Sequence, residues 1–207
     1  MTSFSDRFLD DTVAVIRAID REAVDAVAEV MAATREKGGR LFLAGSGGGA
    51  GHASHATCDF RKLAGFEAYC VTDNVSELTA RTNDEGWDSS YAAWLAASRI
   101  GPNDCLFVFS VGGGSVEPPV SKNLVEAIRL AREVGASVVG VAGRDGGVLA
   151  QLATACVVLP SCDSSLVTPQ TEGLQAVVWH LLVSHPTLAR STPKWEGLTQ
   201  MAPVPGS

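Results

Sequence analysis

The stretch RLFLAGSGGGAGHASHATCDF, residues 40–60, decides the fold. Its apolar start (40–45) predicts a short buried strand, and its end opens a predicted helix over 51–64. Between them lies a loop with five glycines in the seven residues 45–51. Small side chains that lead into a helix N-terminus leave backbone N–H groups exposed, and together with the helix dipole these favour a bound anion. The stretch therefore predicts the first strand, loop and helix of an α/β fold with a site at the loop.

The same alternation continues along the chain. Apolar residues that recur with a period near 3.6 predict helices over residues 4–37, with a break near residue 20. Further strands are predicted at 67–72, 105–110, 137–143 and 155–160, and further helices at 74–81, 88–99, 121–134 and 168–184. Continuous apolar strands between helices predict a parallel sheet covered on both faces. We expect N-terminal helices (1–38), a sheet domain (39–186) and a C-terminal tail (187–207) that ends in disorder.

Composition narrows the function classes. The chain has 207 residues and a net charge of −7, which argues against a general nucleic-acid binder. No apolar run approaches the roughly 18–20 residues that span a bilayer, so no membrane partner is expected. The polar N-terminus does not resemble a signal peptide. Among the five cysteines, those at 70, 105 and 156 lie in apolar runs and are expected to be reduced core residues, which indicates the cytoplasm.

Three loops rich in Gly and Ser follow predicted strands, at 45–51, 110–121 and 143–147. In open parallel sheets ligands bind outside the carboxyl ends of the strands, so these loops should converge on one site. The first loop lacks the lysine of a P-loop, and it fits only a loose dinucleotide pattern that ends in Ala50. The second loop contributes the hydroxyl groups of Ser110 and Ser121. Ser121 is also the predicted N-cap of the next helix. The loops together favour phosphate or a similar anion.

Two pairs of metal-ligand side chains stand in different predicted helices. His55 and Asp59 are four residues apart and share one helix face, and Glu172 and His180 are eight residues apart on one face of the last helix. His180 lies within the apolar run AVVWHLLV, where a lone histidine is more often a core residue. If the two pairs meet, two imidazoles and two carboxylates would suit Zn²⁺ or a similar divalent ion.

Ordered motifs over residues 5–185 resemble the phosphoheptose isomerases (sedoheptulose-7-phosphate isomerases) of the sugar isomerase (SIS) domain superfamily. The motifs are AGSGGGAGHASHATCDF, TARTNDEGW, VFSVGGG…SKNLVEAI, VVGVAGRDGGVLAQLA, ACVVLPS and TPQTEGLQAVVWHLL. The resemblance implies a five-stranded parallel sheet in a three-layer α/β sandwich, with N-terminal helices that assemble a homotetramer. It also implies conversion of a ketose 7-phosphate to an aldose through an enediol.

The resemblance also implies the site residues. The metal ligands, usually to zinc, fall on His55, Asp59, Glu172 and His180. Asp59 is the expected base and His180 the opposite acid or base. The expected substrate contacts are Ser46, Gly47, Gly48, Asp59, Asn83, Asp84, Ser110, Val111, Gly112, Ser121 and Glu172.

The chain departs from the family pattern at the site. Ser46 replaces an Asn, Gly49 a Ser, Asp59 a Glu and Glu172 a Gln; the Ser-Thr-Ser phosphate loop is SVGGG, followed by an inserted SVEPP. We expect these changes to affect which substrate is bound more than which type of reaction is catalysed. The leading hypothesis is a metal-dependent isomerase of sedoheptulose 7-phosphate or a close phosphosugar relative. The alternative is a non-catalytic SIS module that binds a sugar phosphate as a regulator or scaffold.

Overall fold

A computed structural model describes residues 2–197, and the predicted end of the tail, 198–207, lies outside them. Within the described residues the strands form one all-parallel sheet in the order β2-β1-β3-β4-β5. The strands are β1 (Leu41–Gly45), β2 (Ala68–Cys70), β3 (Cys105–Ser110), β4 (Ser137–Ala142) and β5 (Ala155–Val158). The register pairs Leu41 with Ala68 on one side and with Cys105 on the other.

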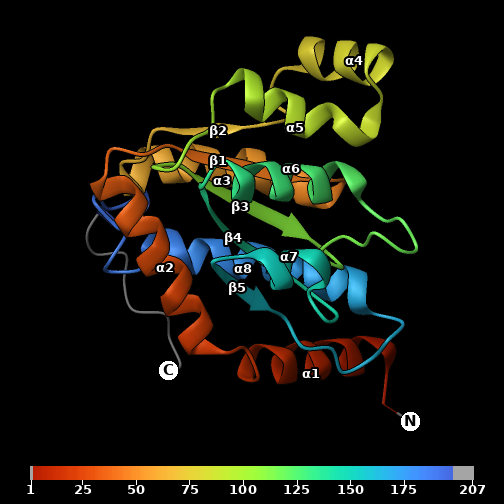
Figure 1. Cartoon of the computed structure of the whole chain (residues 1–207). Helices are drawn as coiled ribbons and strands as arrows, with labels where there is room; N and C mark the ends of the chain where they lie inside the picture. The colour runs from red at the N-terminus through yellow and green to blue at the C-terminus, as the bar shows by residue number, and fades with distance from the viewer. Residues whose placement is uncertain (1, 198–207) are drawn as a thin grey trace.

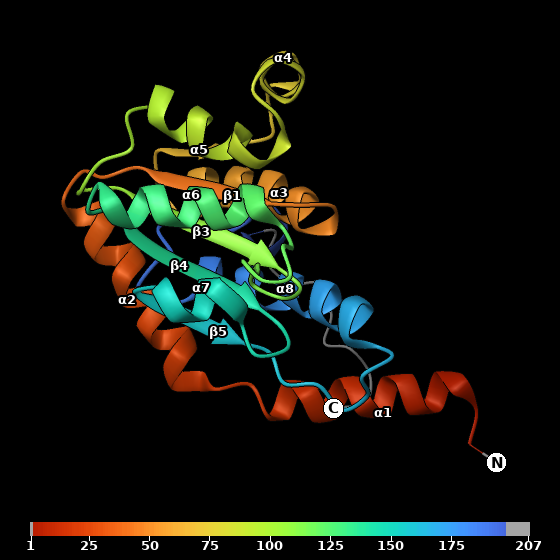
Figure 2. The same ribbon diagram turned by 45° about the vertical axis from the view of Figure 1, so that its right-hand side comes forward.

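Helices cover both faces of this sheet (Figures 1 and 2). In chain order they are α1 (Phe4–Arg17), α2 (Arg21–Glu36), α3 (Gly48–Ala64), α4 (Val75–Asp84), α5 (Trp87–Ala97), α6 (Lys122–Glu133), α7 (Gly147–Leu152), α8 (Val167–Ser184) and α9 (Lys194–Gly197). One face carries α2, α3 and α8, and the other carries α5, α6 and α7. The prediction of a three-layer α/β sandwich with a five-stranded parallel sheet is confirmed.

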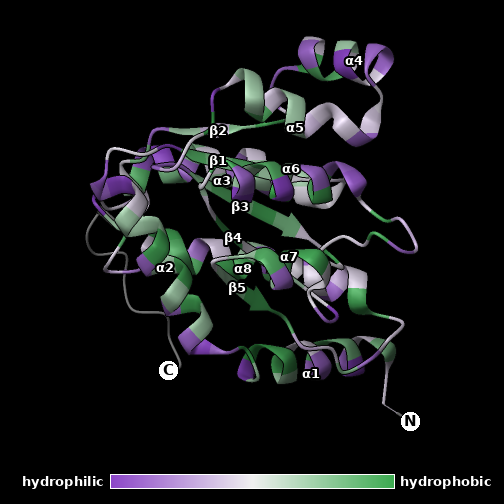
Figure 3. Cartoon of the chain, viewed as in Figure 1, coloured by the Kyte–Doolittle hydropathy of each residue, from purple (hydrophilic) through white to green (hydrophobic). Residues whose placement is uncertain are grey.

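Alternation of side chains along the strands produces the two halves of the core. Leu41 and Leu43 of β1 join the buried cluster beneath α2, α3 and α8, whereas Phe42 and Ala44 join the cluster beneath α5, α6 and α7. Every residue of β1 and β3 is buried, because a sheet with helices on both faces has no solvated side. These strands are therefore continuous apolar runs, and Figure 3 shows β3 and β5 in green.

The two N-terminal helices are separated at the predicted break. Asp20 caps α2, and its carboxylate accepts hydrogen bonds from the N–H groups of Glu22 (3.0 Å) and Ala23 (3.2 Å). Helix α2 buries its apolar face against β4 and β5, whereas α1 buries only Val15 and lies at the margin of the molecule in both ribbon views. Apolar side chains on α1 remain exposed.

The glycine-rich first loop is shorter than predicted. Helix α3 begins at Gly48, so four residues of the predicted loop 45–51 are helical. The glycines serve close packing here, since a side chain at Gly49 would collide with the backbone of Phe109 in β3. Helix α7 was not predicted, because its six residues are too few to show a helical period.

Within residues 2–197, none of the helices combines the length and the apolar character needed to cross a membrane. All five cysteines are thiols, with Cys70 and Cys105 buried and Cys156 partly buried against the core, as predicted for these three. Burial raises the pKa of the Cys70 thiol to about 11.

An ion pair joins the amino ends of β1 and β3. The Asp104 carboxylate is 7% exposed and accepts hydrogen bonds from the Arg40 backbone N–H (2.8 Å), from its guanidinium (2.8 and 3.2 Å) and from the Gly101 N–H (2.9 Å). Burial alone raises the pKa of Asp104, but these donors outweigh it and hold the pKa below its ordinary value of 3.8. The ionised carboxylate therefore stabilises the folded chain at neutral pH.

We expect Asp104→Asn to lower the free energy of unfolding by about 1–3 kcal/mol at pH 7, because a buried charge-assisted network is broken. The loss should shrink at pH 3, since the stability that a lowered pKa provides disappears as the pH falls through the folded-state value. Urea unfolding at both pH values measures this, with Glu36→Gln as the control for an exposed carboxylate. An equal loss at both pH values would contradict the electrostatic explanation.

Candidate active site

The strand order places a crevice between β1 and β3. In a sheet ordered 2-1-3-4-5 the connections after these two strands leave in opposite directions, and ligands bind at this point outside the carboxyl ends. A cavity of ≈ 200 Å³ opens there. It is lined by Ser46, Phe109, Ser110, Val111, Gly112, Val120, Ser121, Leu124 and Arg144. Residues of all three Gly/Ser-rich loops contribute, so the predicted convergence of these loops is confirmed.

Buried hydrogen bonds hold the two serines that begin the loops. The Ser110 hydroxyl accepts from the Gly113 N–H (2.9 Å), and the Ser46 hydroxyl accepts from the Asn123 amide (3.0 Å). Behind them the Gln175 amide, which is fully buried, donates to the carbonyl oxygen of Ser110 (3.0 Å). Each serine hydroxyl therefore accepts one hydrogen bond from the protein, and its O–H can donate to an acceptor in the cavity.

Ser121 stands at the predicted cap position but does not cap the helix. Its backbone is left-handed, with φ 51°, and its side chain makes no capping hydrogen bond to α6. The reason is the conformation, since a capping serine normally has an extended backbone. Its hydroxyl and the first N–H groups of α6 therefore have no capping partner within the described residues.

Glu172 occupies the N-terminus of α3. A Cβ added at Gly48 would lie 2.6–2.7 Å from the Glu172 carboxyl group, so the carboxylate of α8 rests on the first turn of α3. A negative side chain is favourable at this end of a helix. The anion expected at the first glycine loop is thus supplied by the protein itself, and a ligand anion finds room in the cavity near Ser110 and Ser121.

His55, Asp59 and His180 come together between α3 and α8. Their potential ligand atoms all lie within 4.8 Å of one another, and His55 Nε2 is 3.9 Å from Asp59 Oδ2. Asp59 is 19% exposed at its side chain and His55 is 63% exposed, so the group opens to solvent. Glu172, the fourth predicted ligand, is not a member of this group.

The histidine rings are held in defined orientations. His180 Nδ1 lies 2.7 Å from the Ala176 carbonyl oxygen, which can only accept, so Nδ1 carries the proton and Nε2 presents its lone pair. The His55 ring meets the Trp179 ring edge-on at a centroid distance of 4.8 Å. His52 is half-buried, and burial lowers its pKa, so its ring is neutral at pH 7.

Two predicted contacts lie elsewhere. Asn83 and Asp84 are exposed at the end of α4, which buries none of its residues, and neither lines the cavity. Arg144, which does line it, was not among the predicted site residues. The sequence could have identified Arg144 as a site residue, because it directly follows the fourth strand, in a loop that was expected at the site.

Comparison with known proteins identifies the family. The SIS domain family matches residues 7–143. The lincomycin biosynthesis protein LmbN of Streptomyces lincolnensis is 37% identical over 184 residues, covering 86% of this chain, and the chain spans 66% of that protein's length. A phosphoheptose isomerase of Rhodospirillum rubrum is 33% identical, covering 77% of this chain and 82% of the relative.

Solved structures agree on the fold. A phosphoheptose isomerase from Francisella tularensis superposes with a TM-score of 0.74 at 22% identity, covering 89% of this chain and 97% of that one. The fold, the cavity at the strand ends and the sequence similarity lead to one conclusion. The chain belongs to the SIS domain family and, within it, to the phosphoheptose isomerase family of phosphosugar isomerases.

Proposed function

We propose that the chain is a metal-dependent ketose/aldose isomerase that converts sedoheptulose 7-phosphate to a heptose 7-phosphate, or acts on a close phosphosugar relative. The observation that carries the proposal is the cluster of His55 and Asp59, on the helix α3 that begins beside the cavity, with His180 of α8. His55 follows Gly48 by seven residues, about 10 Å along α3. A substrate held at both places must be an extended chain of several carbons.

The anion end of the substrate would lie at Ser110 and Ser121, with Ser46, Gly47 and Gly48 beside its carbon chain. The two serine hydroxyls and the N–H groups of Val111 and Gly112 are the donors in this proposal. Neutral donors at the end of a helix suit a phosphate oxygen. Asn83 and Asp84 complete the predicted contacts, although neither lines the cavity within this chain.

The residues at the cluster fit a divalent ion. Two imidazole nitrogens and a carboxylate oxygen are ligands that Zn²⁺ accepts, and the three ligand atoms lie within 4.8 Å of one another. His55, Asp59 and His180 would hold the ion, with Glu172 as the fourth ligand if its carboxylate leaves Gly48. When bound, the ion would supply Lewis acidity to the substrate oxygens.

Proton transfer is assigned to two side chains. Aldose and ketose differ by a proton moved between C1 and C2 and another moved between their oxygens. Asp59 would remove the carbon-bound proton and return it to the neighbouring carbon of the enediol. His180 would move the oxygen-bound proton; because Nδ1 is engaged by the Ala176 carbonyl, this falls to Nε2, which can carry the proton only while it is not bound to the ion.

The test is an NMR assay of sedoheptulose 7-phosphate in D₂O, beside a panel of other ketose phosphates, with and without added zinc. The proposal expects conversion to the aldose and deuterium at C2 of the product. Binding of sedoheptulose 7-phosphate without conversion or deuterium exchange would favour the non-catalytic SIS module instead.

We also propose a homotetramer in which residues 1–38 form the oligomerisation unit, 39–186 the catalytic domain and 187–207 the tail. The supporting observation is the unburied apolar side of α1. Its exposed fractions are 63% for Phe4, 62% for Leu9, 44% for Val13 and 42% for Ile16. Figure 3 shows apolar segments of α1 in green.

Light scattering should give a mass four times that of the 21.5 kDa chain. Val13→Glu should shift the protein toward smaller species, because it places a charge on the apolar side of α1. Val75→Glu, at an exposed valine on α4, is the matched control and should leave the mass unchanged. A monomer in the unchanged protein at micromolar concentration would contradict the tetramer.

A further inference from the structure

We propose that Arg144 is a substrate-binding residue that supplies the cation for the phosphate group. This inference rests on the proposed function in one respect only, namely that the anion belongs to the substrate. Arg144 lines the cavity at the strand ends, and it also lines two neighbouring cavities of ≈ 490 Å³ and ≈ 670 Å³. It is the one cationic side chain among the residues that line these three cavities.

The backbone beneath Arg144 is fixed by the loop that holds Ser110. The N–H groups of Val148 and Leu149, at the start of α7, donate to the carbonyl oxygens of Gly114 and Gly113, both at 3.0 Å. A side chain at Gly113 would collide with the Gly146 carbonyl, so the two loops are packed backbone against backbone. Arg144 is therefore held at a constant place relative to the anion cavity.

The conformation of Arg144 is itself unusual for an arginine. Its φ of 55° lies in the left-handed region, which few residues other than glycine adopt. In this conformation its stem passes beside Gly112, where an added Cβ would lie 3.5 Å from Arg144 Cδ. Gly112 is one of the residues predicted to contact the substrate. Arg144 is exposed, and its stem lies beside the loop that holds Gly112.

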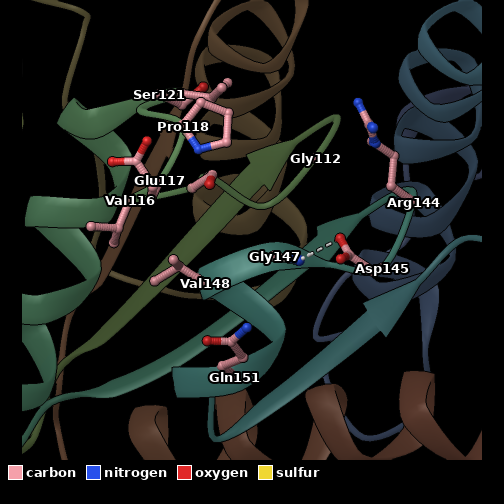
Figure 4. Close-up of a pocket in the computed structure, with 13 residues that line it drawn as sticks. Gly112, Val116, Glu117, Pro118, Ser121, Arg144, Asp145, Gly147, Val148 and Gln151 are labelled. Atoms are coloured by element: carbon pink, nitrogen blue, oxygen red, sulfur yellow. Dashed lines mark hydrogen bonds between the residues drawn. The ribbon is translucent and has the colours of Figure 1, made fainter.

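The guanidinium lacks a counter-ion within residues 2–197. None of the ion pairs in this part of the chain includes Arg144. The adjacent Asp145 carboxylate instead accepts from the Gly147 N–H at 3.2 Å. Figure 4 shows Glu117 on the opposite side of the ≈ 490 Å³ cavity from Arg144. The cation is therefore available to a ligand.

A phosphate group bound in this cavity would need a cationic partner. The other polar groups that line the cavity are the neutral hydroxyls of Ser46, Ser110 and Ser121. Lys122 follows Ser121, but its ammonium group is 2.6 Å from Asp88 and lines none of the three cavities. A guanidinium can donate two parallel hydrogen bonds to phosphate oxygens, which a lysine cannot reproduce. Arg144 would thus balance the charge that the serines leave uncompensated.

The experiment compares Arg144→Gln, Arg144→Lys and the control Lys122→Gln in the full chain. Isothermal titration calorimetry with inorganic phosphate measures the anion site without turnover, and steady-state kinetics with sedoheptulose 7-phosphate gives KM and kcat. We expect Arg144→Gln to weaken phosphate binding and raise KM by about 10- to 100-fold, with a smaller change in kcat. Arg144→Lys should recover only part of the loss, and Lys122→Gln should change neither constant more than about twofold.

The outcomes separate this inference from the proposed function. Phosphate affinity in Arg144→Gln equal to that of the unchanged protein overturns the inference, whatever the enzyme activity. Weakened phosphate binding in a protein that isomerises no phosphosugar supports the anion site and refutes the function. If Arg144→Gln does not fold by circular dichroism, the decision rests on Arg144→Lys, for which unchanged phosphate affinity and KM overturn the bidentate role.

Discussion

Replacement of Asp59 by Asn should lower kcat by about 10²- to 10⁴-fold, with a much smaller change in KM. An amide has nearly the shape of the carboxylate but cannot accept a proton at neutral pH. Asp59 lies half-buried on α3, with its carboxylate within 4.8 Å of ligand atoms of His55 and His180. Because its proposed role is to carry the proton between C1 and C2, its loss removes the chemical step and leaves the anion cavity unchanged.

Two further variants make this result specific. Asp73→Asn removes an exposed carboxylate that accepts from the Ser54 hydroxyl on the outer side of α3, and it should leave kcat unchanged. Asp59→Glu should retain a substantial part of the activity, since the resemblance places a glutamate at this position. Solvent deuterium exchange at C2, followed by NMR, reports the proton transfer directly. Undiminished exchange in Asp59→Asn would exclude Asp59 as the base.

The sheet and its loops could be predicted because they depend on the residue types within short stretches of the sequence. The runs at 41–45 and 105–110 are short and apolar at almost every position, as expected of strands that are buried on both faces. The glycine and serine residues that follow them mark the carboxyl ends. The pairing of His55 and Asp59 also follows from spacing along one helix. These features need no knowledge of contacts between distant segments.

What the sequence could not predict depends on contacts between distant segments. Gly48 and Gly49 have the composition of a loop, yet they begin α3, and they are glycines because Glu172 and Phe109 leave no room for side chains there. Ser121 has the residue type of a cap but a left-handed backbone, which the loop after β3 imposes. Arg144 acquires its position from the packing of two glycine loops. In each case tertiary packing overrides local preference.

The placement of Glu172 has a consequence for the metal. Its carboxylate rests at the N-terminus of α3, while the other three predicted ligands lie further along α3 and α8. A glutamate that moves from Gly48 to the cluster would expose the first N–H groups of α3 to the substrate. Loading of the metal and opening of the sugar site near Gly48 would then accompany each other in the proposed enzyme.

His180→Gln should reduce both the bound metal and the turnover. Glutamine can reach with an amide oxygen, but it provides neither the nitrogen ligand that Zn²⁺ prefers nor a group that exchanges protons near neutral pH. We expect zinc, measured by mass spectrometry after reconstitution, to fall from about one per subunit to well below half, and kcat to fall by at least about 10²-fold. His185→Gln, at the end of the same helix and facing Asp25 at 3.3 Å, is the matched control and should keep both.

The pattern of results assigns the role of His180. Loss of turnover with zinc retained would make His180 the proton-transfer group and leave His55 and Asp59 as the ligands. Full turnover in protein stripped of zinc by a chelator would exclude the metal and leave Asp59 and His180 as a carboxylate and imidazole pair. Joint loss of zinc and turnover, with the fold intact by circular dichroism, is the expected result, because His180 belongs to the only three-residue ligand group among residues 2–197.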